Sequence, residues 1–255
     1  MQNVQPREGT QSLDDWCATE QLPEQLLYLC NGPALLILGH REGTQQWQFE
    51  PHWQGLLTVR LGLTVIAGAA QVCQLLAAGL IKLQFFIDQA FAVGEKPHAK
   101  GPLSSLIGPE AMMNDDFHLE QWYLGQALQR EPEYLAFAQA LRCGESYRLV
   151  SFLSNEGGMG GKMHLLAERY GVSVSHFRRL CRRALGSRSK TELREWRTAR
   201  ALLAVAEQPA SLTEVALNHG YASSSHFSKE IRDFLGVMPS SLTDITRLSG
   251  KMRHS

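Results

Sequence analysis

The tripeptide Ser-His-Phe occurs twice in this chain, at residues 175–177 and 225–227, and its surroundings repeat with it over about 25 residues. Residues upstream of the tripeptide recur at an offset of 49 and those downstream at an offset of 50, as in the pairs Ala167 and Ala216, Gly171 and Gly220, Leu185 and Leu235, Gly186 and Gly236. The chain therefore contains a duplicated unit, and the second copy carries one additional residue between its glycine and its tripeptide.

Each copy has the sequence pattern of two helices joined by a tight turn, which is the outline of a helix-turn-helix. In the first copy, Leu165, Leu166 and Tyr170 lie at helical spacing. Gly171 can adopt the positive φ that ends a helix, and Ser173 is placed to cap the next one. The second copy follows the same plan, with a capping-box pair Ser211 and Glu214, then Gly220, then a cap at Ser223.

The second helix of each copy has an apolar side and a polar side. The residues predicted to face inward are Phe177, Leu180 and Leu185 in the first copy and Phe227, Ile231 and Leu235 in the second. The residues predicted to face outward are Ser175, Arg178, Arg179, Arg182 and Arg183 in the first copy and Ser225, His226, Lys229 and Arg232 in the second. The outer face of the first helix is predicted to be basic, whereas the second helix offers fewer long hydrogen-bond donors.

Residues 191–208 separate the two copies and contain neither Pro nor Gly, so they predict one connecting helix roughly 27 Å long. Successive major-groove faces of B-DNA lie about 34 Å apart, so two units on a rigid connector can enter adjacent grooves without a dimer.

Charge is divided unevenly along this formally neutral chain. Residues 160–255 contain 16 Lys+Arg against 8 Asp+Glu, and the remaining residues contain 9 against 17. A basic face alone is more often solvated surface, and protein docking is the other alternative to DNA binding. Combined with a duplicated helix-turn-helix, it predicts a DNA-binding domain that neutralises phosphates.

Residues 145–242 resemble the AraC/XylS-type DNA-binding domain, on the motif residues Ala216, Gly220-Tyr221, 225–229 and 236–239. They are similar in more detail to InvF-type activators of type III secretion genes, on residues 176–181, 183–186, 192–194, 196–197 and 218–221. Three positions depart from the family pattern: Ile231 and Cys181 stand where Phe is common, and Leu242-Thr243 stands in place of Tyr-Arg.

The resemblance implies a role for each outward residue. The positions that match the family's base-reading residues are Ser175, Arg178, Arg179, Ser225, His226 and Lys229. Arg182, Arg183 and Arg232 match positions at the groove edges, where contacts to phosphates position a protein without specifying sequence. Arginine can bind O6 and N7 of guanine together, whereas Ser and His read bases less exclusively.

The N-terminal half predicts a small sheet followed by helices. Apolar runs at 26–30, 34–38, 46–49 and 56–66 are typical of strands. Helical spacing indicates helices at 69–91, 117–129 and 132–143, with a loop at 94–102. The predicted fold class is α+β, with a regulatory domain of mixed sheet and helices over 1–143. An all-α domain over 144–255 follows, with helix-turn-helix units at about 163–186 and 212–236 joined by the long helix at about 191–208.

Several other classes of protein are disfavoured by the sequence. Residues 61–81 carry no charge, but three glycines and a change of period favour a buried strand and a core helix over a membrane span. The first 25 residues are polar and resemble no signal peptide, which predicts a cytoplasmic protein. When bound to DNA, it is expected to be associated with the nucleoid.

No cofactor, metal site or catalytic residue is predicted. The cysteines at 17, 30, 73, 143 and 181 form no Cys-x-x-Cys pair, and the histidines form no metal-ligand spacing. The glycine-rich run 157–162 lacks the Walker spacing and favours a loop between helices. These observations predict a chain that is not an enzyme.

The resemblance implies a transcriptional activator that binds double-stranded promoter DNA and contacts RNA polymerase. It also implies a tetratricopeptide-repeat type III secretion chaperone as co-activator, and it leaves a homodimer open. The alternative is an AraC-type regulator whose N-terminal half senses a small ligand or is a fused enzyme.

Overall fold

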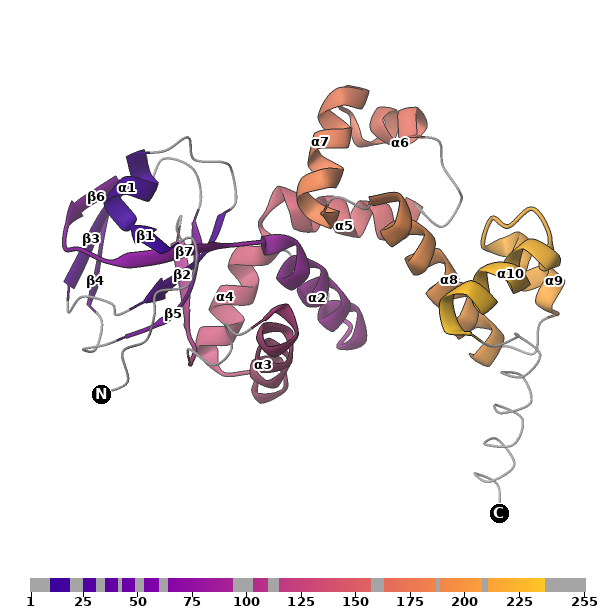
Figure 1. The fold of residues 1–255 in the computed structure, drawn as a ribbon, viewed down its shortest axis with the longest axis horizontal. Helices are drawn as coiled ribbons and strands as arrows, with labels where there is room; N and C mark the ends of the chain where they lie inside the picture. The colour runs from indigo at the N-terminus through magenta and orange to yellow at the C-terminus, as the bar shows by residue number, and fades with distance from the viewer. Residues whose placement is uncertain are drawn as a thin grey trace, which may run out of the picture. The chain divides into compact units, whose positions relative to one another are not determined.

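The computed structural model of the chain describes residues 10–18, 25–30, 35–40, 43–48, 53–59, 64–93, 103–109, 115–156, 163–186, 189–207 and 211–236. The chain divides into two compact units, Met1–Arg148 and Leu149–Ser255, which are drawn in Figure 1 and described separately below.

The first unit contains two antiparallel sheets. The five-stranded sheet has the order β1-β7-β2-β5-β8, with bounds Thr10–Ser12, Gln71–Leu75, Gln25–Cys30, Gly55–Val59 and Leu103–Ile107. The three-stranded sheet has the order β4-β3-β6, with bounds Gly43–Gln48, Leu35–His40 and Thr64–Ala67. The short helix α1 (Leu13–Ala18) follows β1 directly.

Strand β2 lies in the middle of the larger sheet and is buried on both faces. Leu27 and Leu29 belong to one apolar core together with Leu13 and Trp16 of α1, and Val65 of β6 packs against that core. The neighbouring β2 residues 26 and 28 point to the opposite face and are also buried. Burial of both faces accounts for the nearly continuous apolar sequence of this strand.

Three helices follow in the first unit, α2 (Ala77–Ala90), α3 (Asp116–Gln129) and α4 (Pro132–Arg142). Each contacts the other two, and α4 also contacts β5 and β8. In Figure 1 they lie together beside the five-stranded sheet. The predicted α+β class and the helices predicted at 117–129 and 132–143 are therefore confirmed.

Two predictions for this unit are wrong. The segment 56–66 is not one strand, because β5 and β6 belong to different sheets. The helix predicted from residue 69 begins at Ala77, and β7 instead pairs with β1 and β2. The apolar positions within residues 72–75 fit both the helical and the strand period. These residues form a strand because β2 supplies backbone hydrogen-bond partners. Strand β8 was not predicted, and the predicted loop at 94–102 lies outside the described residues.

A buried polar cluster joins these helices. Nε of Arg142 donates to Asp88 at 2.8 Å and its Nη2 donates to the same carboxylate at 2.7 Å. Gln84 donates to Asp88 at 2.8 Å, and it accepts from Tyr123 at 2.6 Å and from Tyr134 at 3.1 Å. The cluster satisfies the buried charges with one another, as an apolar interior requires.

The first residues of α5 (Glu145–Glu156) also reach this cluster, because the Tyr147 hydroxyl donates to Asp88 at 2.6 Å. Burial first, and then this hydrogen bond, raise the pKa of Tyr147 far above that of a free phenol, so the hydroxyl remains a donor. The compact units accordingly divide inside α5, between Arg148 and Leu149, a few residues beyond the division placed at 143 and 144 from sequence.

The second unit is helical in its described residues, with α6 (Met163–Tyr170), α7 (Val174–Leu185), α8 (Ser189–Glu207), α9 (Leu212–Asn218) and α10 (Ser224–Leu235). One core packs Phe152 of α5 against Tyr170 and Phe177. The other consists of Ala201, Val205, Val215, Ala216, Tyr221, Phe227 and Ile231. The predicted pair of helix-turn-helix units and their connecting helix is present.

None of the described helices is both long enough and apolar enough to span a bilayer. The described part of the uncharged stretch 61–81 forms β6, β7 and the first turn of α2.

Candidate nucleic-acid interface

The turns of the two helix-turn-helix units have the same backbone geometry. Gly171 and Gly220 have φ values of 81° and 74°, as predicted from their positions. The N–H of Val172 donates to the carbonyl of Ala167 at 3.1 Å, and the N–H of Tyr221 donates to that of Ala216 at 2.9 Å. A side chain at either glycine would strain the left-handed backbone that closes the turn.

Both recognition helices, α7 and α10, begin at the predicted serine caps. The Ser173 hydroxyl accepts from the N–H of His176 at 3.3 Å, and the Ser223 hydroxyl accepts from the N–H of His226 at 3.1 Å. The tripeptide histidine thus supplies the capped backbone N–H in both copies. This local role explains why the serine position recurs relative to the tripeptide.

The predicted capping box of α9 is also present. The Glu214 N–H donates to the Ser211 hydroxyl at 3.2 Å, and the Ser211 N–H donates to the Glu214 carboxylate at 2.9 Å. The hydrogen bonds from the Ser211 backbone and then from its hydroxyl lower the pKa of Glu214.

Helix α7 presents a row of cations to solvent. Ser175, Arg178, Arg179 and Arg182 are exposed and Arg183 is half-buried, whereas the predicted inward residues Phe177, Leu180 and Leu185 are buried. No carboxylate among the described residues forms an ion pair with these arginines. In the preceding helix α6, Leu166 and Ala167 occupy the core positions and Leu165 is 45% exposed.

Helix α10 presents a smaller and mostly polar surface. Ser225, Lys229 and Arg232 line one shallow hollow together with Thr213 of α9. These three α10 residues are spaced by four and three positions and therefore lie on one side of the helix. His226 is also exposed, but its ring lies edge-on to Tyr221 at 5.8 Å and its Nε2 lies 3.7 Å from Glu230. Of the four predicted contacts, three share the hollow and His226 lies beside it.

Phe227 and Ile231 are fully buried beneath this surface, as predicted. The side chain of Leu235 lies outside the described residues.

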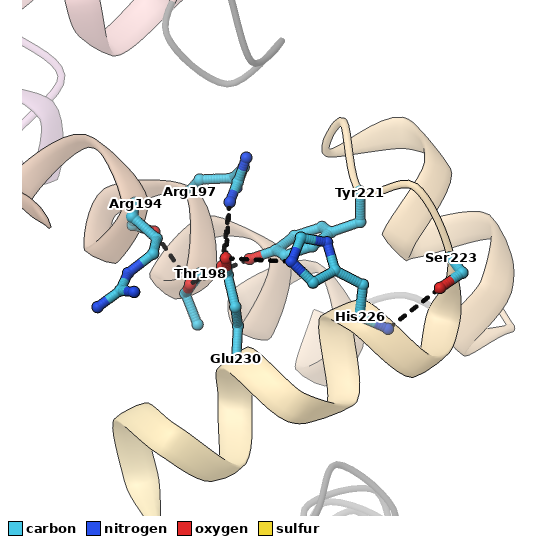
Figure 2. Close-up of polar contacts among 7 residues, drawn as sticks. All are labelled: Arg194, Arg197, Thr198, Tyr221, Ser223, His226 and Glu230. Atoms are coloured by element: carbon cyan, nitrogen blue, oxygen red, sulfur yellow. Dashed lines mark hydrogen bonds and ion pairs between the residues drawn. The ribbon is translucent and has the colours of Figure 1, made fainter. Parts of the chain in front are cut away.

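Four residues whose contacts were not predicted from the sequence join α8 to the second helix-turn-helix, and we refer to Arg197, Thr198, Tyr221 and Glu230 as the interhelix cluster (Figure 2). Nη2 of Arg197 lies 3.0 and 3.1 Å from the two carboxylate oxygens of Glu230. The Thr198 hydroxyl lies 3.0 Å from the Tyr221 hydroxyl and 3.3 Å from Glu230. The guanidinium carbon of Arg197 lies 4.5 Å from the centre of the Tyr221 ring.

Burial and pairing both affect the ionisation of this cluster. Burial alone would lower the pKa of Arg197, but hydrogen bonds to Glu230 and Tyr221 outweigh it and raise that pKa. Burial raises the pKa of Tyr221. The cluster therefore contains a permanent cation and a neutral phenol at neutral pH. Arg197 and Glu230 are separated by 33 residues, so their contact cannot be recognised from local sequence. The one local signal was a polar residue, Thr198, on the buried side of a helix.

Cys73 and Cys181 are buried free thiols. Burial raises the pKa of Cys181 to about 11, so this thiol is protonated and packs as an apolar group. No group of His, Cys, Asp and Glu that could hold a metal ion occurs among the described residues.

Two helix-turn-helix units, each with an exposed polar recognition helix and joined by one helix, define a DNA-binding transcriptional regulator. A family model described as a helix-turn-helix domain matches residues 166–244. The invasion protein InvF of Salmonella typhimurium (strain LT2) is 43% identical over 174 residues, which cover 68% of this chain and 80% of InvF. The transcriptional regulator MxiE of Shigella flexneri is 43% identical over 114 residues, covering 44% of this chain and 54% of MxiE. The chain belongs to the AraC-type family of regulators that includes InvF and MxiE.

Solved structures also match, at lower similarity. A DNA-binding transcriptional dual regulator from Escherichia coli K-12 is 22% identical with a TM-score of 0.36, over 40% of this chain and 92% of its own. ToxT from Vibrio cholerae O395 is 11% identical with a TM-score of 0.38, over 88% and 91% of the two chains. Neither match carries functional information about this chain.

Proposed function

We propose that this regulator activates type III secretion genes by reading a promoter with α7 and α10. The main support for DNA binding is that both recognition helices expose cationic side chains that have no carboxylate partner among the described residues. The similarity to the invasion protein InvF supports type III secretion genes as the targets. Ser175, Arg178, Arg179, Ser225, His226 and Lys229 read bases in this proposal, and Arg182, Arg183 and Arg232 contact phosphates.

The length of α8 supports simultaneous insertion of both helices. Its 19 residues span about 28 Å, which is comparable with the roughly 34 Å between successive major-groove faces. One chain then covers two segments of the promoter. In this proposal, the chain bound at these two segments also contacts RNA polymerase.

DNA binding is tested by selecting duplexes from a random library with the full-length chain and titrating salt. We expect an enriched sequence and a log K that falls linearly with log salt, by about 0.9 for each phosphate contacted. Equal affinity for the selected and a scrambled duplex at every salt concentration would contradict sequence-specific binding.

We further propose that the acidic N-terminal half receives the activating signal from a protein, namely a tetratricopeptide-repeat chaperone of the secreted translocators. The excess of 17 acidic over 9 basic residues before residue 160 supports a protein partner of complementary charge. The chaperone would add binding energy to the promoter complex or relieve self-association.

Co-purification of the tagged full-length chain with the chaperone encoded near the secretion translocators tests this step. A stoichiometric complex is expected. If DNA binding is intact and no complex forms, the signal would have to come from self-association or from a small ligand.

A further inference from the structure

The two recognition helices are attached to their units by different chemistry. Leu180 of α7 is buried in an apolar core, and the equivalent position in the second copy is Glu230, fifty residues later. Phe177 packs against the rings of Phe152 and Tyr170 in the first helix-turn-helix. In the second helix-turn-helix, Glu230 instead points to Arg197 and Thr198 of the connecting helix (Figure 2).

We infer that Arg197, Thr198 and Glu230 are positioning residues that fix the angle between α8 and α10 and thereby set which bases the second recognition helix can reach. This inference rests on the proposed reading of DNA by α10. None of the three is on the exposed face that we assign to base or phosphate contacts.

The geometry of the interhelix cluster restrains rotation as well as distance. Both carboxylate oxygens of Glu230 lie within 3.1 Å of one guanidinium nitrogen, and that guanidinium lies over the Tyr221 ring at 4.5 Å. Hydrogen bonds weaken steeply away from their preferred angles, whereas apolar contacts are not directional. The exposed fractions of the Arg197 and Glu230 side chains are 17% and 13%, so solvent screens this pair only weakly.

A small change in helix angle has a large effect on base contacts. Helix α10 has 12 residues and is therefore about 18 Å long. A tilt of about 10° moves one end of such a helix by about 3 Å relative to the other, which is more than a direct hydrogen bond tolerates.

The cluster also reaches the DNA-facing surface directly. Nε2 of His226 lies 3.7 Å from Glu230, so a carboxylate that Arg197 and Thr198 hold in place also limits where the imidazole can lie. Arg197 therefore acts on base contact through Glu230 and not by touching DNA.

A variant that exchanges the pair for apolar residues separates positioning from stability. We choose Arg197→Met/Glu230→Leu, since leucine is the residue at the equivalent position of the first copy. Replacing a buried ion pair with apolar groups is often neutral for stability, whereas its directional restraint is lost. The matched control is Arg194→Met/Glu195→Leu, which removes one cation and one anion from the same connecting helix and keeps the net charge equal.

The probes are a duplex selected by the parent chain and two derivatives, each scrambled in one half. The half read by α7 is the one whose discrimination Arg178→Ala relaxes. We expect the full-length interhelix variant to bind the selected duplex about ten- to a hundredfold more weakly. It should no longer discriminate in the α10 half, should keep its discrimination in the α7 half, and should melt within a few degrees of the parent. The control should discriminate in both halves.

Retained discrimination in both halves, with parental affinity, would overturn the inference. If the double variant loses cooperative melting, Glu230→Gln replaces it, because the amide keeps the side-chain shape and loses the charge. If Glu230→Gln loses discrimination only in the α10 half, the inference is supported. If it discriminates in both halves as the parent does, the inference is overturned. A parent chain that discriminates in neither half would instead refute the proposed function itself.

Discussion

The exposed arginines of α7 are the residues on which sequence-specific binding should depend most. Arg178 and Arg179 project to solvent one turn after the capped start of the helix, and guanidinium groups can bind O6 and N7 of guanine together. We predict that Arg178→Ala and Arg179→Ala each cost about 1 to 3 kcal/mol of specific binding and relax base preference. Titrations on the selected duplex and its single-base variants measure both effects.

Arg183 provides the comparison within the same helix. Its side chain is half-buried near the end of α7, at a position assigned to phosphate contact. Arg183→Ala should weaken binding to selected and random duplexes alike and reduce the salt slope by about one. If all three alanine variants weaken both duplexes equally, the assigned reading roles are wrong.

The Cys181 thiol should be unreactive in the folded protein. Burial raises its pKa from 9.0 to about 11, so the nucleophilic thiolate is scarce at pH 8. The raised pKa also means that this group makes the folded state less stable as pH rises above about 9, and has no effect below that. Ellman titration should give the same native count for the parent and for Cys181→Ser, and one fewer thiol for the variant after unfolding. A difference in the native count would contradict burial.

At the scale of single elements, a side chain at a turn glycine should destabilise the fold. Gly171 has open space where a Cβ would lie, so its φ of 81° is the only obstacle to substitution. We predict that Gly171→Ala destabilises the second unit by about 1 to 2 kcal/mol, the cost of left-handed backbone for an L-residue. Gly125→Ala in α3 is the control: its position is also open and helical, so it should stabilise by up to about 1 kcal/mol. Urea melts of both variants test this contrast, and equal effects would contradict it.

The elements that the sequence predicted correctly are those whose causes are local. Ser173 and Ser223 cap helices three residues away, and Gly171 and Gly220 close turns within their own units. Each of these interactions joins residues only a few positions apart, and the same pattern occurs in both copies of the repeat. The exposed faces of α7 and α10 follow from the same helical period.

The elements that the sequence did not predict depend on partners far along the chain. Residues 71–75 become a strand because β2 and β1 supply their backbone hydrogen bonds. Glu230 pairs with Arg197, which lies 33 residues earlier, and the helical period of either helix does not indicate this pair. His226 is different, because it lies beside Glu230 through their spacing of four residues in α10, a local relation that the helical period contains.

At the scale of the molecule, the first unit depends on one buried ion pair. Asp88 and Arg142 are almost fully buried and link α2 to α4, and Tyr147 brings α5 to the same carboxylate. Arg142→Met leaves Asp88 buried without a cation, and we predict a loss of about 3 to 5 kcal/mol in the unfolding free energy of this unit. The control is Arg130→Met, which removes an exposed arginine lying over Phe91 and should cost about 1 kcal/mol or less.

Differential scanning calorimetry of the full-length variants separates the two units, since they are compact bodies that need not unfold together. Arg142→Met should lower the melting transition assigned to the first unit. Equal effects of the two arginine variants would show that the buried pair contributes no more than a surface contact.

The central claim is that one chain reads DNA with two recognition helices carried on one connecting helix. Hydroxyl-radical footprinting of the full-length chain on the selected duplex tests it most directly. We predict two protected segments on one face of the duplex, centred about 10 base pairs apart, with Arg178→Ala weakening one segment and Lys229→Ala the other. A single protected segment, weakened by Arg178→Ala and unaffected by Lys229→Ala, would contradict the claim.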